Sequence, residues 1–198
     1  MRLAIDLNDV LRDFSPNFLK TYCQRYNHEY NLDNFEYWTN DMSILFPFAS
    51  DNAYSKFVYA DYVYELFGKC DVCERGLEAL FNTWVTETIH NLGISEPIEL
   101  LIVSAKEYGE SIGASLFFLS KIGSKVREVY FPKDSATIWD KCDALITANP
   151  SLLECKPEGK KAVKIKREYN SESGCDLSYS TLTKLIKDED FFNKLEIK

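Results

Sequence analysis

The feature that most constrains the fold is the apolar run Leu-Leu-Ile-Val at 100–103, which lies between Glu99 and Ser104. It has the length of a strand, and an uninterrupted apolar run is typical of a strand that is buried on both faces. Four further segments have the pattern of short strands, at residues 2–5, 126–131, 143–147 and 161–165. Because helical segments separate the later runs, we predict right-handed crossovers between parallel strands. The expected fold class is α/β, with a Rossmann-like core of about five parallel strands.

The segment between the first two predicted strands has a helical pattern that is rich in aromatic residues. Aromatic side chains recur at four-residue spacing from Phe14 to Tyr26, and Pro16 suits the first turn of a helix. Two further helical faces lie at 54–62 and 77–92. Such stripes are more typical of packing than of a cofactor site, so we expect these helices to build a core of their own.

These patterns predict one α/β core with an inserted helical cap. The cap is expected over 12–95, and the core over 1–11 and 96–198, with a covering helix at 180–192. No repeat or Pro/Gly-rich linker separates two independent domains. The basic residues between 160 and 167 are expected to form a solvated strand edge, since lysines commonly protect exposed edges.

Charge and hydropathy exclude two classes of partner. The formal net charge of -8 would repel a long polyanion over most of the surface, so a nucleic-acid polymer is a poor partner. No apolar run is long enough to cross a membrane, and the N-terminus lacks a basic region followed by an apolar stretch. We therefore expect a cytoplasmic protein that does not bind membranes.

The cysteine pattern favours reduced thiols over a metal or disulfide framework. Six cysteines are spread over the chain, without the dense spacing of a small disulfide-stapled protein. Cys70 and Cys73 form a lone Cys-x-x-Cys, but neither a second such pair nor a His-x3-5-His follows it. Because structural zinc needs four ligands, we interpret both as ordinary thiols.

Asp6 is the residue with the clearest chemical potential. It follows the first predicted strand, and in an open parallel sheet the reactive crevice lies at the carboxyl ends of the strands. A carboxylate there can attack phosphorus to form an aspartyl-phosphate, which splits a difficult hydrolysis into two easier steps. The plainer interpretation is that Asp6 caps the turn after the strand.

The stretch Asp6-Leu7-Asn8-Asp9-Val10-Leu11 resembles the first motif of the haloacid dehalogenase-like (HAD) superfamily, Asp-x-Asp-x-[Thr/Val]-[Leu/Val]. More narrowly, IDLNDVLRDF is similar to the opening of the 5'(3')-deoxyribonucleotidase-like branch, in which a helical cap follows. Ser104 matches the Ser or Thr that ends the second-motif strand. Lys133, with Lys141 as the second choice, matches the lysine of the third motif. The segment 144–150 occupies the place of the fourth, and the resemblance covers the chain from end to end.

The resemblance implies an Mg²⁺-dependent phosphohydrolase site at the carboxyl edge of a HAD-like core. In that site Asp6 would be the nucleophile, and Ser104 and Lys133 would hold the phosphoryl oxygens. The metal would bind Asp6 and the backbone carbonyl of Asn8. The aromatic cap would offer a stacking platform for a base, for which Phe14, Tyr22 and Trp38 are candidates.

The departures from the family pattern concern the acids. Asn8 stands at the position of the general acid/base Asp, and an amide does not exchange protons near neutral pH. Thr147 and Ala148 stand at the positions of acidic metal ligands. Asp143 begins its predicted strand, so it lies at the opposite end of the sheet. Asp9 replaces the usual Gly, and we expect it to be a surface or loop-capping residue.

The sequence therefore predicts a HAD-like protein with degenerate catalytic motifs, whose phosphohydrolase site is impaired or lost. Its expected ligand is a small phosphorylated molecule, with a nucleotide as one candidate and Mg²⁺ as the cofactor of a weakened site. The alternative is an active phosphomonoesterase or nucleotidase that uses Asp6 as nucleophile and replaces the missing acid by Asp9 or water.

Overall fold

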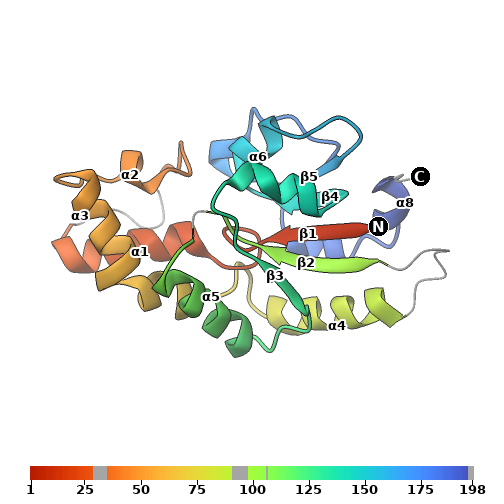
Figure 1. The fold of residues 1–198 in the computed structure, drawn as a ribbon, viewed down its shortest axis with the longest axis horizontal. Coiled ribbons are helices and arrows are strands. Elements are labelled where there is room, and N and C mark those ends of the chain that lie inside the picture. The colour runs from red at the N-terminus through yellow and green to blue at the C-terminus, as the bar shows by residue number, and fades with distance from the viewer. Residues whose placement is uncertain (29–34, 91–97, 106, 196–198) are drawn as a thin grey trace.

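The computed structural model describes residues 1–28, 35–90, 98–105 and 107–195, and its centre is a six-stranded parallel sheet. The strand order is β3-β2-β1-β4-β5-β6 (Figure 1). The bounds are β1 Arg2–Asp6, β2 Glu99–Val103, β3 Glu128–Tyr130, β4 Ala144–Thr147, β5 Lys161–Ile165 and β6 Leu177–Tyr179. The predicted α/β fold class and parallel sheet are confirmed, but the sheet has six strands rather than five.

The additional strand β6 gave no recognisable pattern because it is three residues long and only partly buried. It pairs with β5 through Val163↔Leu177, so β5 lies inside the sheet and the predicted solvated edge there is wrong. Lys164 of β5 is 7% exposed, and its Nζ donates to the carbonyls of Asn170 (3.2 Å) and Ser173 (2.6 Å). A buried lysine thus holds the loop that leads into β6.

Replacing Lys164 by Met should lower the free energy of unfolding by about 1–3 kcal/mol, since buried carbonyls lose a charged donor. Urea unfolding followed by circular dichroism measures this difference. Lys166→Met is the matched control, because Lys166 lies one residue beyond β5 and is exposed. Equal effects of the two substitutions would contradict the role given to Lys164.

Two apolar layers cover the sheet, and alternate residues of β1 point into different layers. Leu3 and Ile5 pack in one layer, and Ala4 packs in the other. The first layer is covered by α4 (Leu77–His90), α7 (Leu182–Ile186), α8 (Phe191–Leu195) and part of α5 (Glu110–Lys121). The second lies under the 3₁₀ helix η4 (Ser135–Lys141) and α6 (Pro150–Glu154), and the 3₁₀ turn η5 (Glu168–Asn170) follows β5.

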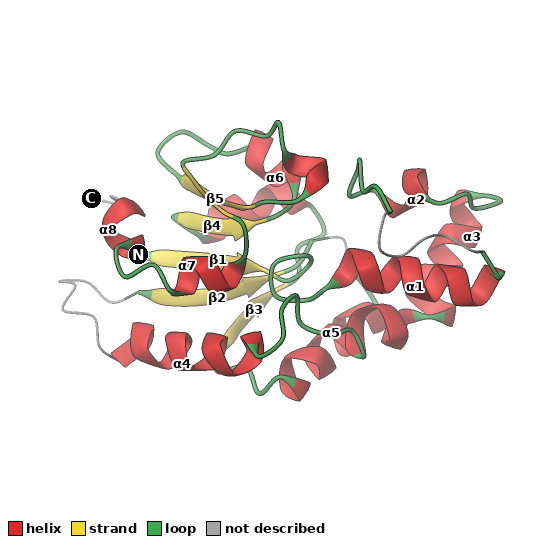
Figure 2. Cartoon of the chain, turned by 180° about the vertical axis from the view of Figure 1, so that it is seen from behind, coloured by secondary structure: helices red, strands yellow, loops and turns green. Residues whose placement is uncertain are grey.

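The aromatic helices form a separate cap at the carboxyl end of the strands (Figure 2). Its elements are α1 (Phe14–Tyr26), α2 (Met42–Leu45), α3 (Asp51–Lys56) and two π-helical turns, η2 (Phe57–Asp61) and η3 (Tyr64–Gly68). Phe18, Tyr22 and Phe46 form its centre, with ring centroids 4.8 Å (Tyr22–Phe46) and 5.1 Å (Phe18–Phe46) apart. The cap touches the core where Gly68 meets α5, since a Cβ on Gly68 would lie 3.3 Å from the carbonyl oxygen of Ala114.

Two predicted segments differ from the structure. The expected cap over 12–95 included the helix α4, but its residues Leu77, Phe81 and Val85 pack in the same layer as β1. An apolar stripe predicts burial without stating the partner, so α4 belongs with the core; residues 91–95 lie outside the described residues. The covering helix expected at 180–192 is two short helices, α7 and α8, because Asp188 begins a turn between them.

None of the helices in the described ranges is both long enough and apolar enough to cross a membrane.

Candidate active site

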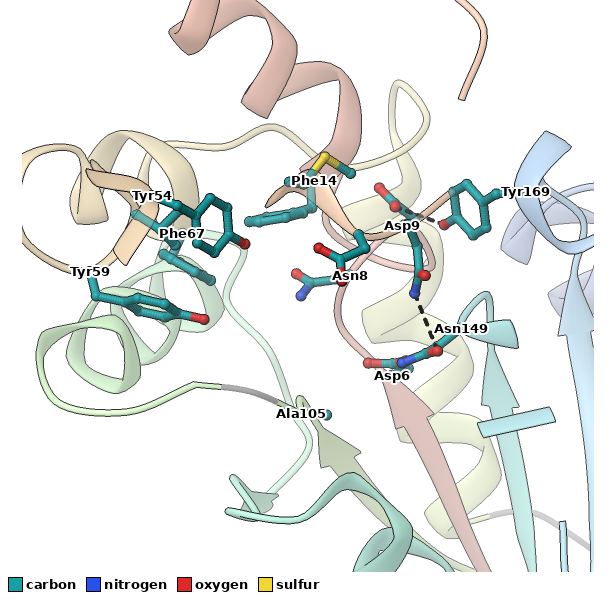
Figure 3. Close-up of a pocket in the computed structure, with 14 residues that line it drawn as sticks. Asp6, Asn8, Asp9, Phe14, Tyr54, Tyr59, Phe67, Ala105, Asn149 and Tyr169 are labelled. Atoms are coloured by element: carbon teal, nitrogen blue, oxygen red, sulfur yellow. Dashed lines mark hydrogen bonds between the residues drawn. The ribbon is translucent and has the colours of Figure 1, made fainter. Parts of the chain in front are cut away.

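Asp6 ends β1 and lines a pocket between the strand ends and the cap, with a volume of about 100 Å³. Figure 3 shows the two sides of this pocket. Its polar side comes from the core and includes Asp6, Asn8 and Asn149. Its aromatic side comes mainly from the cap and includes the rings of Phe14, Tyr54, Tyr59 and Phe67. The structure thus places the predicted nucleophile in a pocket beneath the cap.

The carboxyl group of Asp6 is 4% exposed, and its Oδ2 accepts a hydrogen bond of 2.7 Å from Thr147 Oγ1. Burial raises its pKa to about 7, although the Thr147 hydroxyl acts in the opposite direction. The neighbouring Asp9 raises the pKa further. Asp6 therefore divides between its protonated and ionised forms near neutral pH, and only the ionised form is a nucleophile.

The side-chain carbonyl of Asn8 is held by Arg12. Arg12 Nε lies 2.9 Å and Nη2 lies 2.6 Å from Asn8 Oδ1. The Arg12 side chain is completely buried, and its Nη2 also pairs with Glu107 Oε1 at 2.7 Å. Its Nη1 donates to the Phe67 carbonyl and to Ser115 Oγ. This buried network fixes an amide, which cannot transfer a proton, beside Asp6.

The predicted phosphate-binding residues are not brought to the pocket. Ser104 is fully buried, and its hydroxyl donates to Glu107 Oε1 at 2.5 Å, so contact with a phosphate would require that bond to break. Lys133 and Lys141 are exposed, and Lys141 Nζ lies 5.7 Å from the centre of the Tyr130 ring. Among the described residues, no lysine or arginine lines the pocket. The phosphate roles of Ser104 and Lys133 stay predictions.

Asp9 caps the first helix of the cap. Its Oδ1 accepts from the Ser15 backbone N–H at 2.8 Å, and its Oδ2 accepts from the hydroxyls of Ser15 and Tyr169. The backbone of Asp9 is left-handed, with φ 57°, a conformation that Asp tolerates better than most residues. The loop-capping role is confirmed, whereas a surface position is wrong because Asp9 is 4% exposed.

The donors at the pocket fall short of a resident magnesium site. Mg²⁺ is usually bound through one or two carboxylates with water and substrate oxygens. Asp6 and the backbone carbonyl of Asn8 could supply two oxygens, but the Asp9 carboxylate is already occupied by protein donors. Asp143 accepts from the Arg2 backbone N–H at the opposite end of the sheet. Within the described ranges, no three His, Cys, Asp or Glu side chains form a metal-binding group.

The fourth-motif segment contributes Asn149 to the pocket lining, which does not include Thr147 or Ala148. Ala148 is 1% exposed and packs in the core, and the Thr147 hydroxyl donates a hydrogen bond to Asp6. Asn149 lines the pocket, and its Oδ1 accepts from the Ser151 backbone N–H (3.0 Å) and from Asn40 Nδ2 (3.2 Å). The sequence interpretation missed Asn149, Arg12 and Glu107. Arg12 directly follows the apolar pair Val10-Leu11, and this position could have indicated that its charge is buried.

Of the three proposed stacking platforms, only Phe14 lines the pocket. Tyr22 is 1% exposed within the cap cluster, so it is not available to a ligand. Trp38 is exposed and is not among the residues that line the pocket.

The Cys-x-x-Cys pair behaves as two ordinary thiols. Cys70 is buried, and its Sγ donates to the Asp13 carbonyl. Burial raises the pKa of Cys70 to about 12 and the pKa of Cys73 well above its usual value. Both thiols therefore stay protonated and are poor nucleophiles.

No protein-family model matches the chain, and no curated protein sequence matches it. Among solved structures, a proposed haloacid dehalogenase-like hydrolase from Burkholderia xenovorans superposes with a TM-score of 0.59 at 10% sequence identity. The match covers 96% of this chain and 97% of that protein. At this identity the likeness concerns the fold alone. The chain therefore shares the fold of that protein, with a Rossmann-like core built on a parallel sheet.

Proposed function

We propose that this protein binds a small phosphorylated ligand beside Asp6, in the pocket between sheet and cap, and hydrolyses it slowly or not at all. The observation that carries the proposal is Asn8, whose amide is fixed by Arg12 next to Asp6. The position of Asp6 and the likeness to a hydrolase fold support a phosphohydrolase type of site.

The chemistry of the site explains why turnover would be slow. When Asp6 is ionised it can attack phosphorus, but the leaving oxygen must then receive a proton. Asn8 cannot give one, and the Asp9 carboxylate accepts hydrogen bonds from Ser15 and Tyr169. Loss of general acid catalysis typically lowers a rate by ~10²–10⁴-fold.

The size of the pocket restricts the ligand. Sites for drug-sized molecules usually enclose about 300–1,000 Å³, whereas this cavity has a volume of about 100 Å³. A phosphoryl group with a small substituent fits this space, and a nucleotide would require the cap to move away from the sheet. Mg²⁺ would be bound weakly, since the Asp9 carboxylate accepts from Ser15 and Tyr169 and one oxygen of Asp6 accepts from Thr147.

The second candidate function is an active phosphomonoesterase or nucleotidase, and the position of Asp6 in the pocket favours it. The two functions differ in turnover. The pure protein is incubated with p-nitrophenyl phosphate and with a panel of nucleoside monophosphates in the presence of Mg²⁺, beside Asp6→Asn. We expect little or no release of phosphate from any of them. Turnover that Asp6→Asn abolishes would establish the second function instead.

Restoring an acid at position 8 is not expected to restore activity by itself. In Asn8→Asp, the Arg12 guanidinium would pair with the new carboxylate and keep it ionised, so it would be a poor proton donor. Phosphate release from p-nitrophenyl phosphate should not rise above the level of the unmodified protein. A large gain in rate would show that the missing acid alone limits turnover.

A further inference from the structure

The amide orientation of Asn8 follows from the chemistry of its neighbour. A guanidinium has five N–H donors and no acceptor, so the atom of Asn8 that faces Arg12 must be the carbonyl oxygen. Two Arg12 nitrogens, Nε and Nη2, donate to it. The other polar atom of the side chain is therefore the amide nitrogen, and Asn8 lines the pocket. This nitrogen has no hydrogen-bond partner in the part of the chain that the structure describes.

Asn149 is oriented in the same way by different donors. The Ser151 backbone N–H can only donate, so it fixes Oδ1 of Asn149 as the acceptor at 3.0 Å. Asn40 Nδ2 donates to the same oxygen at 3.2 Å. The amide nitrogen of Asn149 is thus left without a protein partner within the described ranges. Figure 3 shows Asn149, Asn8 and Asp6 gathered on the same side of the pocket.

The carboxylates of the pocket restrict the charge of a ligand. Asp9 and Asp41 line the same pocket, and their carboxyl oxygens accept hydrogen bonds from Ser15 and Ser43. The pocket lining that the structure describes includes no lysine or arginine, and Arg167, outside the lining, donates to the Asp9 backbone carbonyl. Two neutral amide donors beside these carboxylates suit an oxyanion with one negative charge, because each further charge adds repulsion without a new partner.

We propose that the side-chain amides of Asn8 and Asn149 together bind the phosphoryl oxygens of a singly charged phosphate ester beside Asp6, without a metal ion. This inference rests on the proposed function and adds the chemical class of the ligand and the groups that recognise it. The rings of Phe14, Tyr54 and Phe67 on the opposite side of the pocket suit a small apolar substituent on the ester.

Calorimetric titration with methyl phenyl phosphate, in buffer with EDTA, tests the inference. This diester carries one charge, and inorganic sulfate serves as the oxyanion with two. We expect the diester to bind and sulfate to bind at least about tenfold more weakly, since repulsion rises with charge. Asn8→Asp and Asn149→Asp should each weaken diester binding by about tenfold or more, because each removes an N–H donor to a charged group.

The two substitutions are chosen to preserve the fold. Asp retains the oxygen that Arg12 or Ser151 donates to, so each variant keeps its internal hydrogen bonds. Asn52→Asp on the exposed start of α3 is the matched control for the added charge, and it should bind the diester as the unmodified protein does. In two-dimensional NMR spectra, the side-chain amide signals of Asn8 and Asn149, identified by their loss in the variants, should shift as the diester is added.

The outcomes separate this inference from the proposed function. Unchanged diester binding by both variants, or binding that appears only when Mg²⁺ replaces EDTA, overturns the amide pair and leaves the proposed function standing. Absence of binding for the diester, p-nitrophenyl phosphate and the nucleoside monophosphates, with and without Mg²⁺, overturns both.

Discussion

Replacing Arg12 by Met is expected to lower the free energy of unfolding by about 3–5 kcal/mol, because it leaves a charge buried without its partner. Glu107 has a side-chain exposure of 1%, and Arg12 Nη2 is 2.7 Å from its Oε1. The substitution also removes the donor that holds Asn8 Oδ1. Glu107→Gln should have a smaller effect in the same direction, since an amide oxygen can still accept from the guanidinium.

Urea unfolding of Arg12→Met, Glu107→Leu and the double variant forms a thermodynamic cycle. The double variant should be much more stable than the sum of the single losses predicts, because apolar replacement of both partners removes the unpaired charge. Lys69→Met is the control: Lys69 and Glu65 form an exposed ion pair at 2.9 Å, and such pairs contribute about 0–1 kcal/mol. A loss below 1 kcal/mol for Arg12→Met would contradict the central role of this ion pair.

The predictable part of the fold is the part that apolar runs encode. The run at 100–103 forms β2, and the strand before Asp6 forms β1, because strands buried on both faces need little besides apolar residues. β6 was missed because three partly buried residues carry no such pattern. The placement of α4 was wrong for a different reason: its stripe predicts burial, but the contact with β1 rather than with the cap is decided by the tertiary structure.

The candidate site also has a part that the sequence predicts and a part that it does not. Asp6 was predictable because a carboxylate that follows a strand lies at the reactive edge of a parallel sheet. The network around it was not, since Arg12 and Glu107 are 95 positions apart in the chain and neither matches a family motif. The free ends of Asn8 and Asn149 depend on which atoms their neighbours donate to, and hydrogen-bond directions are not encoded in residue order. The sequence located the candidate nucleophile, and the structure showed which residues surround it.

Asp6→Asn is expected to stabilise the protein by about 2–4 kcal/mol above pH 7 and to have little effect near pH 4. The folded state raises the pKa of Asp6 from 3.8 to about 7, so it binds this proton more tightly than the unfolded chain does. The contribution of Asp6 to the free energy of unfolding is therefore fully present below pH 4 and is lost as the pH rises toward 7. Asn is neutral at every pH and can still accept the Thr147 hydrogen bond, so the variant avoids this loss.

Urea unfolding of both proteins at a series of pH values between 4 and 8 measures the difference directly. The pKa of Asp13 is also raised, to about 6, so Asp13 also lowers the stability as the pH rises. Asp13 is present in both proteins, so its contribution cancels in the comparison. A difference that does not vary with pH would show that Asp6 is not held in a desolvated site. The same substitution removes the candidate nucleophile, and a gain in stability without any change in turnover would show that the buried carboxyl lowers stability without contributing catalysis.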